Sequence, residues 1–303
     1  MKYASILKSS TVLVIFMNED LHLLLRELAR IRKRPLLVFN SVDIQPESVI
    51  LTEKVLGSKK FQELDILVQT PGGDPHSAFK IVKLFRKNAK KVNIIVPLLA
   101  KSAGTLICLG ADKIIMSEIS ELGPLDTQIA ESRQGDVQFK SALNGFKALE
   151  QVQTHALENL DIATRVIYER SGLKMLEAIE LAIEFSGKTS ACLYNQLDPM
   201  NIGEYKRSLE ISERYGHLIL INLMGWSKEK AHSVAMSLIY DYPSHDSIID
   251  MEELKRLGFD TVEIEENQKE VLDKIKIRLQ KENGDFIHLV ENNKRKNSKN
   301  VVQ

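Results

Sequence analysis

The sequence predicts an α/β protein built around a mostly parallel sheet, with added helices. In the first half of the chain, strand-like and helix-like segments alternate at the spacing of strand–helix–strand crossovers. The strand-like segments are short, continuous apolar runs, a pattern typical of strands that are buried on both faces of a parallel sheet. From about residue 134 to residue 184 the strand signals stop and the pattern becomes helical, so we expect further helices to be attached to the sheet.

Each expected strand is an apolar run bounded by Pro, Gly or polar residues. The run TVLVIFM at Thr11–Met17 predicts a first strand or an N-terminal arm. Further strands are expected in the first half of the chain at Pro35–Ser41, Leu64–Gln69, Val92–Leu99 and Asp112–Met116. The run TVEI at Thr261–Ile264 predicts a closing strand.

The expected helices carry apolar residues at helical spacing. The first, Asp20–Arg34, has a basic end, which suits a helix C-terminus. The helices expected within the sheet region are Glu47–Leu56, Ser77–Lys87 and Ala103–Gly110. The later ones are two helices within Asn201–Ile239, broken near Gly216–Trp226, followed by Met251–Leu257 and Lys269–Lys281.

We expect residues 1–281 to form a single domain, with a helical insertion at about residues 134–240. Residues 282–303 end in the polar, basic run NNKRKNSKN, which has no periodicity. Such a composition cannot bury enough apolar surface to order itself. The sequence therefore predicts a disordered basic tail over residues 282–303.

Composition excludes several classes of protein. Lys and Arg total 41 and Asp and Glu total 41, so the formal net charge is zero and gives no global reason to bind nucleic acid or an anionic membrane. Two cysteines, Cys108 and Cys192, exclude a disulfide scaffold and a four-cysteine zinc site. No His-x-x-x-His pair occurs, so we expect no metal. No run approaches the roughly 20 apolar residues of a spanning helix, and we expect a cytoplasmic protein.

Two turns that follow expected strands contain residues suited to chemistry. The first, Thr70–Asp74 (TPGGD), has adjacent glycines that let a backbone approach a ligand, although an ordinary strand-to-helix turn has the same composition. The second is Ala100–Thr105 (AKSAGT), where Ser102 is expected either to cap the helix that follows or to act as a nucleophile. A nucleophile there would lie at the positive end of a helix, which stabilises an oxyanion.

Two other segments are weaker candidates. The segment Glu121–Asp126 (ELGPLD) is a turn by composition. The segment Ser244–Asp246 (SHD) places a histidine beside a carboxylate, but one histidine and one carboxylate do not make a metal site.

Taken in order, these segments resemble the serine dehydrogenase proteinase family of Clp-fold serine peptidases. The resemblance is carried by QTPGGD, by IIVPLLAKSAGTLICLGADKIIM and by SELGPLDTQI, within about residues 64–128. A second patch, YPSHDSIIDMEELKRLGF, begins at Tyr242. Signal peptide peptidase A and the Clp proteolytic subunit are more distant relatives. The resemblance implies a Clp/crotonase-like fold with repeated β-β-α units around the mostly parallel sheet.

The resemblance also implies roles for individual residues. Ser102 matches the nucleophile of the family. The backbone N–H groups of Gly73 and Ala103 would form the oxyanion hole, and Gly72 would allow the turn that aims them. Gly72, Asp74 and His76 would line the substrate groove.

The general base is left open by the sequence. The stretch around Gly123, where the Clp proteolytic subunit carries a histidine, has none here. Signal peptide peptidase relatives use a lysine, and Lys140 and Lys147 lie seven residues apart, so both could face one side of a helix. We prefer Lys147, with Lys140 as second choice and Lys101, which would point away from an inward-facing serine, as third. His245 is a further candidate, as a base brought close by the fold or as a structural residue.

The expected function is that of a serine endopeptidase with a Ser–Lys dyad, which needs no cofactor. Its expected partners are a polypeptide substrate and, from the resemblance, further copies of the chain in a homo-oligomer. The alternatives are a catalytically inactive interaction module of the same fold and a crotonase-like acyl-CoA enzyme. No basic patch for coenzyme A phosphates lies near the Gly-Gly turn, which disfavours the latter.

Overall fold

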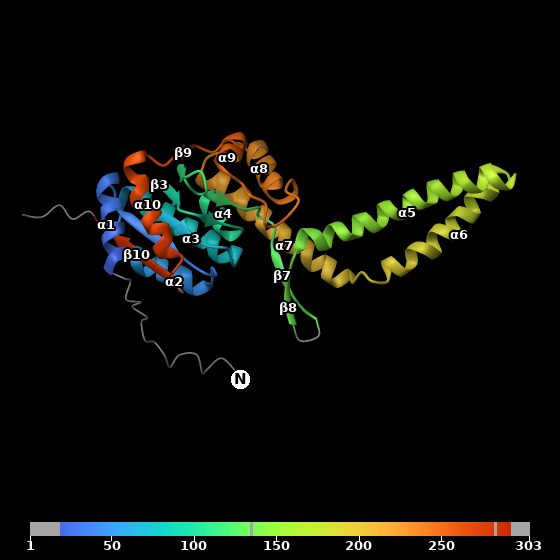
Figure 1. Cartoon of the computed structure of the whole chain (residues 1–303), viewed down its shortest axis with the longest axis horizontal. Helices are drawn as coiled ribbons and strands as arrows, with labels where there is room; N and C mark the ends of the chain where they lie inside the picture. The colour runs from blue at the N-terminus through green and yellow to red at the C-terminus, as the bar shows by residue number, and fades with distance from the viewer. Residues whose placement is uncertain (1–18, 134–135, 282–283, 292–303) are drawn as a thin grey trace, which may run out of the picture.

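The computed structural model describes residues 19–133, 136–281 and 284–291 and is organised around one sheet (Figure 1). The sheet has six strands in the order β10-β1-β2-β3-β5-β9. These strands are β1 (Leu36–Asn40), β2 (Phe61–Gln69), β3 (Ala89–Val96), β5 (Lys113–Met116), β9 (Thr261–Glu263) and β10 (Phe286–Val290). All neighbouring pairs are parallel except β1 with β10, so the predicted α/β class with a mostly parallel sheet is confirmed.

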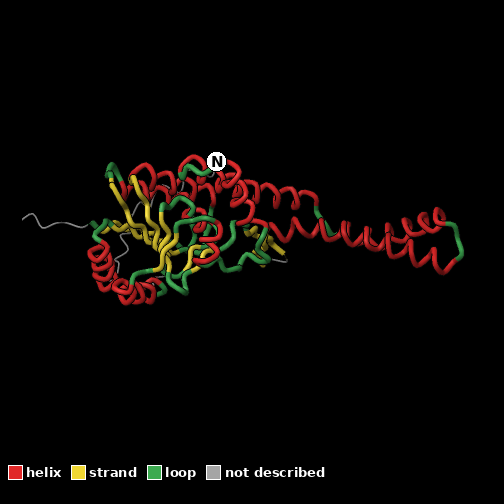
Figure 2. Tube along the Cα trace, turned by 90° about the horizontal axis from the view of Figure 1, so that it is seen from above, coloured by secondary structure: helices red, strands yellow, loops and turns green. Residues whose placement is uncertain are grey.

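Helices cover both faces of the sheet, because alternate strand residues point to opposite sides (Figure 2). One face, with Leu36 and Val38, packs against α1 (Glu19–Arg32) and α10 (Glu266–Leu279). The other face, with Leu37 and Phe39, forms the larger core. The helices that contribute to this larger core include α2 (Pro46–Leu56), α3 (Pro75–Asn88), α4 (Ala103–Cys108), α7 (Pro199–Leu218), α8 (Lys228–Tyr240) and α9 (Met251–Leu257).

The last described strand corrects one prediction. A disordered tail was expected over residues 282–303, yet Phe286–Val290 forms β10, which pairs antiparallel with β1 from Leu36↔Val290 to Asn40↔Phe286. The apolar ends Phe286 and Val290 are buried against the sheet, which repays the cost of ordering the segment. The run NNKRKNSKN, like the expected N-terminal strand at Thr11–Met17, lies outside the described residues.

The structure also corrects the prediction for the segment that follows residue 127. A helical pattern was expected from residue 134, but the structure has a hairpin of β7 (Gln128–Arg133) and β8 (Asp136–Ser141) before the first helix. The helices α5 (Ala142–Ser171) and α6 (Met175–Tyr194) then pack on each other and project away from the body, and α7 returns to it (Figures 1 and 2). A π-helical turn, Ile219–Leu223, separates α7 from α8 where a break was predicted.

Two short strands extend the main sheet toward the candidate site. These are β4 (Leu99–Ala100) and β6 (Glu121–Leu122), which pair in parallel with each other. Isolated bridges join β4 to the end of β2 through Thr70↔Ala100 and join β6 to a later loop through Leu122↔Ile249. The turns after β2 and β4 are thereby brought side by side. No helix among the residues that the structure describes is both long and apolar enough to cross a membrane.

Candidate active site

Ser102 lies in a strained turn between β4 and α4. Its φ of 49° and ψ of −114° place it in a region that a residue with a side chain rarely adopts. Such strain persists only where the surrounding structure imposes it, and it is concentrated at functional sites. Ser102 occupies the N-cap position of α4, but its side chain makes no capping hydrogen bond. The turn thus presents a partly exposed hydroxyl that does not serve the helix.

The Gly-Gly turn after β2 packs directly on this serine turn. Thr70 N–H donates to Leu99 O at 3.1 Å, and Lys101 N–H donates to Thr70 O at 3.0 Å. A Cβ on Gly72, at a φ of 128°, would lie 3.1 Å from the Cβ of Ser102. A Cβ on Gly73, at a φ of 138°, would lie 2.3 Å from Ile44 N. Glycine is therefore required at both positions, by the backbone conformation and by the space.

Ser102, Gly73 and Ala103 open onto one small pocket. Its other lining residues are Pro75, Leu106, Leu125, Thr127 and Ser212, and its empty volume is about 220 Å³. In the described part of the chain, the backbone N–H groups of Gly73 and Ala103 have no hydrogen-bond partner. The pocket therefore joins the Ser102 hydroxyl and two backbone donors to a wall that also carries Thr127 and Ser212, whose hydroxyl groups lie 3.1 Å apart.

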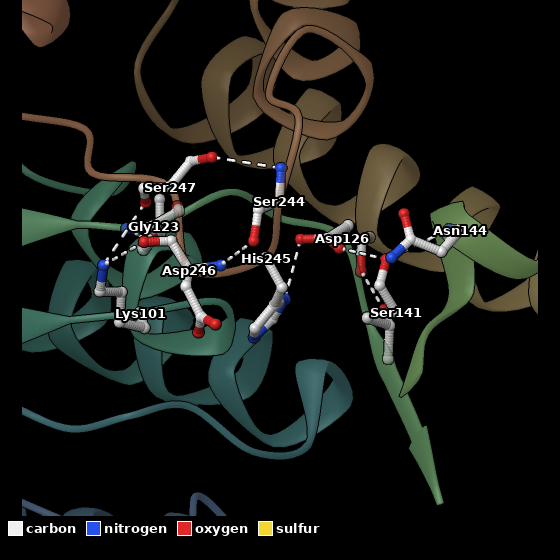
Figure 3. A network of polar contacts seen from close by, with 12 residues as sticks. Lys101, Gly123, Asp126, Ser141, Asn144, Ser244, His245, Asp246 and Ser247 are labelled. Carbon is white, nitrogen blue, oxygen red and sulfur yellow. Dashed lines mark hydrogen bonds and ion pairs between the residues drawn. The ribbon is translucent and has the colours of Figure 1, made fainter. Parts of the chain in front are cut away.

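A loop from far along the chain is fastened beside Ser102. Lys101 Nζ donates to the carbonyl oxygens of Asp246 and Ser247 at 3.5 and 3.4 Å (Figure 3). Backbone hydrogen bonds between Leu122 and Ile249, at 2.9 and 3.1 Å, hold the end of the same loop. The loop that carries His245 is thus attached to the residue that precedes Ser102.

His245 in this loop is paired with a buried carboxylate. Its Nδ1 lies 2.9 Å from Oδ1 of Asp126, which is only 2% exposed (Figure 3). The other carboxylate oxygen accepts a hydrogen bond of 2.7 Å from the Ser141 hydroxyl. Asp126 stands between Leu125 and Thr127, which both line the pocket of Ser102. Asp126 and His245 themselves are not among the residues that line the pocket.

Two residues expected in the substrate groove have other partners. Asp74 is the N-cap of α3 and accepts hydrogen bonds from the N–H groups of His76 and Ser77, at 3.2 and 2.9 Å. His76 Nδ1 lies 2.7 Å from the hydroxyl of Tyr215 on α7. Asp74 therefore has a structural role in the helix start, while His76 is exposed beside the Gly-Gly turn.

The lysine candidates are separated by the fold. Lys140 and Lys147 were expected on one helix, and this expectation is wrong: Lys140 lies in β8, opposite Ile129, and Lys147 lies on α5. Lys147 is half-buried and forms no hydrogen bond or ion pair among the described residues. Lys101 pairs with Glu121 at 2.9 Å. Its side chain also fills the space beside Gly123, where a Cβ would lie 2.6 Å from Lys101 Cδ.

Comparison with known proteins agrees with this geometry. Residues 30–175, which include Ser102, both glycines and Asp126, match the profile of a family described as ClpP-like SDH-type serine proteinase. The match covers the central strands β1, β2, β3 and β5.

Two curated relatives are uncharacterised proteins of Methanocaldococcus jannaschii. MJ0137 is 37% identical over 94 residues, which are 31% of this chain and 32% of the relative. MJ1495 is 28% identical over 149 residues, which are 47% of this chain and 49% of the relative. The chain thus spans no more than about half the length of these relatives.

Among solved structures, two mutant forms of the membrane-bound stomatin-specific protease 1510-N are similar to this chain, one of them in complex with a substrate peptide. Each is 19% identical with a TM-score of 0.29 over 48% of this chain, and the matched part is 67% and 63% of the respective solved chains.

Asp126 is the site residue that sequence reasoning did not single out. Its partner His245 is 119 residues away in the chain, and no local pattern links the two. The only signal was the position of Asp126 within the segment SELGPLDTQI, which carries part of the family resemblance. The carboxylate adjacent to His245 in sequence, Asp246, contributes its backbone carbonyl to Lys101 instead.

Other reactive groups near the site are held in unreactive forms. Burial raises the pKa of the Cys108 thiol at the end of α4 well above its ordinary value, so it stays protonated. Burial, together with a hydrogen bond to Glu253, raises the pKa of the Tyr242 hydroxyl, which donates to that carboxylate at 2.7 Å. Within the described ranges, no three His, Cys, Asp or Glu side chains come together in a group that could hold a metal ion.

Proposed function

We propose that this chain is a serine endopeptidase in which Ser102 attacks the carbonyl carbon of a peptide bond. One observation carries the proposal. Ser102 has a strained backbone and a side chain that makes no capping hydrogen bond, and it shares a pocket with the residues that carry two backbone N–H groups, Gly73 and Ala103. A hydroxyl beside two convergent donors is what acyl transfer requires, because the donors stabilise the oxyanion of the tetrahedral intermediate. The match of residues 30–175 to the profile of a serine proteinase family also supports a serine peptidase.

The substrate we propose is an extended polypeptide. Gly73 is exposed at the site, and the backbone of an extended chain could bind beside it. The pocket wall formed by Pro75, Leu106 and Leu125 would accept a small apolar side chain next to the bond that is cleaved. No cofactor takes part in this chemistry.

The general base distinguishes two versions of the proposal. A Ser–Lys dyad with Lys147 follows from the sequence resemblance. The contact of His245 Nδ1 with the buried carboxylate of Asp126, at 2.9 Å, supports a histidine base as the second version. Both versions share the nucleophile and the oxyanion donors, so the first experiment does not depend on the base.

The nucleophile is tested by labelling with a fluorophosphonate, which reacts with activated serine hydroxyls. We expect the full chain to be labelled at one site and Ser102→Ala to lose the label, because the other two hydroxyls of the pocket, those of Thr127 and Ser212, are hydrogen-bonded to each other at 3.1 Å. Ser120→Ala is the matched control. The hydroxyl of this buried serine donates to Val96 O at 2.7 Å, and Ser120 does not line the pocket. Undiminished labelling of Ser102→Ala would refute the assignment, and no labelling of the wild type would favour a non-catalytic module.

We also propose that copies of this chain associate through the projecting hairpin of α5 and α6. The hairpin carries large apolar side chains that are about half or more exposed, namely Leu157, Ile162, Met175, Leu176, Ile183 and Phe185. Exposed large apolar side chains on a projecting element are typical of association surfaces. A second copy could cover them with the same residues of its own hairpin.

A further inference from the structure

We propose that a groove between α2 and α3 is a docking site for an acidic, amphipathic segment of a partner protein. The groove has a volume of about 860 Å³, and the residues that line it are Val49, Glu53, Lys80, Lys83, Leu84 and Lys87. The two helices pack beside each other in the body of the molecule, apart from the projecting α5 and α6 (Figure 1). None of these residues lines the pocket of Ser102, so the groove is a separate site.

The apolar part of the groove comes from one residue of each helix. Val49 of α2 and Leu84 of α3 are partly buried, because each packs against the larger core with part of its side chain. The rest of each side chain faces the groove. The alkyl stems of neighbouring lysines extend this apolar surface while their ammonium groups stay in water. An aliphatic side chain of a partner would bury apolar surface here, which favours binding.

Three lysines of α3 form a row along this groove. Lys80, Lys83 and Lys87 are spaced by three and four residues, so they share one face of the helix, and all three are exposed. The ammonium group of Lys83 lies 5.7 Å from the centroid of the Phe79 ring. The side chains of Lys80 and Lys87 form no hydrogen bond or ion pair with any residue that the structure describes. Their charges are therefore available to a partner.

A second groove continues the positive charge past the end of α3. Lys87 lines both grooves, and the second one adds the exposed side chains of Lys60 and Lys90. It also contains Arg86, but this guanidinium is already paired with Asp112, at 2.6 and 3.1 Å. The lysines, rather than the arginine, thus provide the uncompensated charge.

The charge balance of this surface differs from that of the whole chain. Three lysines line the first groove and two more line the second, whereas Glu53 is the one carboxylate among the described residues that line them. The whole chain has 41 basic and 41 acidic side chains. A surface with five lysines and one carboxylate has a positive local potential, which attracts and orients an acidic partner.

The combination of an apolar groove with lysines favours a polypeptide as the occupant. An amphipathic helix binds a groove through aliphatic side chains spaced by three or four residues, and carboxylates beside them would reach the lysines. A nucleic acid would pair with the lysines but has no aliphatic side chain to bury against Val49 and Leu84. A flat lipid surface would contact the lysine ends and leave the groove between the helices unfilled. The occupant is therefore a segment with Leu or Ile on one face and Glu or Asp beside it.

The test measures the binding of a fluorescent probe peptide to the full chain by anisotropy. The probe is an amphipathic peptide with leucines at helical spacing and glutamates beside them. The protein carries Ser102→Ala, so the measurement does not depend on the proposed peptidase function. We expect saturable binding whose Kd rises with salt. Replacing Lys80, Lys83 and Lys87 together by Glu should raise the Kd at least about tenfold, because three attractions become repulsions. Glu53→Gln should lower the Kd.

Matched controls separate the possible outcomes. Replacing three exposed lysines on other helices by Glu changes the net charge equally and should leave the Kd close to its original value; these are Lys206, Lys255 and Lys274. Thermal unfolding shows whether each variant is folded. A probe with serines in place of the leucines should bind at least about tenfold more weakly, since it buries no aliphatic side chain.

Three results would overturn the proposal. They are the absence of probe binding, an equal loss of binding in the control variant, and undiminished binding of the serine probe. Vesicles rich in anionic lipid and single-stranded DNA are measured in parallel. If either of them binds through the lysines of α3 while the probe does not, the surface serves that ligand and the acidic polypeptide is excluded.

Discussion

Gly73 contributes to the site through its backbone, because any side chain would disturb both the fold and the donor. At a φ of 138°, an added Cβ would meet Ile44 N at 2.3 Å and Ile44 O at 2.5 Å, and neither backbone atom can rotate away. Backbone strain of this kind costs about 1–3 kcal/mol. The same shift would move the N–H group that we assign to the oxyanion.

We therefore predict that Gly73→Ala lowers the labelling rate by about 10²–10³-fold, the usual loss for one oxyanion donor. We expect a lowered Tm in the same variant, measured by thermal unfolding. Gly187→Ala is the matched control, since Gly187 lies in α6 with nothing within 4 Å of an added Cβ. That control should be neutral or stabilised by about 0.5–1 kcal/mol. Wild-type labelling by Gly73→Ala would contradict the role of this donor.

Individual site residues were predicted from sequence as far as local patterns allow. Ser102 and the two glycines lie in short turns after strands, and the structure brings those turns together. The backbone strain at Ser102 and the pairing of His245 with Asp126 were not predictable, because both depend on contacts between distant segments. The roles of Ser102 and Gly73 remain proposals that the labelling experiments above test.

At the scale of elements, Asp74 lies beside the site but stabilises the start of helix α3 as its N-cap. Its carboxylate accepts from two N–H groups at the start of α3 and from the Ser77 hydroxyl at 2.6 Å. Pro75 at the first helical position is compatible with this cap, because the missing N–H would have had no partner there.

We predict that Asp74→Ala lowers the free energy of unfolding by about 0.5–2 kcal/mol, as loss of an N-cap usually does. Denaturant unfolding measures this change. Asp74→Asn should restore most of the stability, since asparagine caps helices about as well. Labelling at Ser102 should persist in both variants. An Asp74→Ala protein of unchanged stability but without labelling would show that Asp74 belongs to the substrate groove after all.

The elements that the sequence failed to predict share a physical cause. The strands β7 and β8 pair only with each other, in a small antiparallel hairpin, and their residues lack the long apolar runs of the central strands. The strand β10 is apolar but follows a polar stretch, and it is ordered by pairing with β1. A strand that is stabilised by a partner far away in the sequence is not marked by its local composition. A buried parallel strand such as β2 has a continuous apolar run, and its position was predicted closely.

At the scale of the whole molecule, the projecting hairpin exposes several large apolar side chains. The side chains of Leu176 and Phe185 on α6 are 69% and 52% exposed. The buried residues of α6 are small, which gives the two helices a thin interface of their own. Such a pair buries little apolar surface by itself.

We predict that sedimentation of the full chain gives a mass that is a multiple of 34.3 kDa. Replacing Leu176 and Phe185 together by Glu should reduce that mass toward one chain, because burying two carboxylates in an apolar contact is costly. Ile50→Glu is the matched control, since Ile50 is 64% exposed on α2 in the body of the molecule. A monomeric wild type, or dissociation by Ile50→Glu alone, would contradict association through the hairpin.

The placement of β10 has a consequence for solubility. The neighbouring strand β1, LLVFN, is buried along its whole length, and without β10 it would present unpaired N–H and C=O groups at the rim of the sheet. Exposed apolar edges of this kind recruit strands from other molecules and nucleate aggregates. The opposite rim is formed by β9, which has only three residues. By pairing β1 with a strand from late in its own sequence, the chain keeps this fully buried strand in the interior of the sheet and leaves the rims to β10 and the three-residue β9.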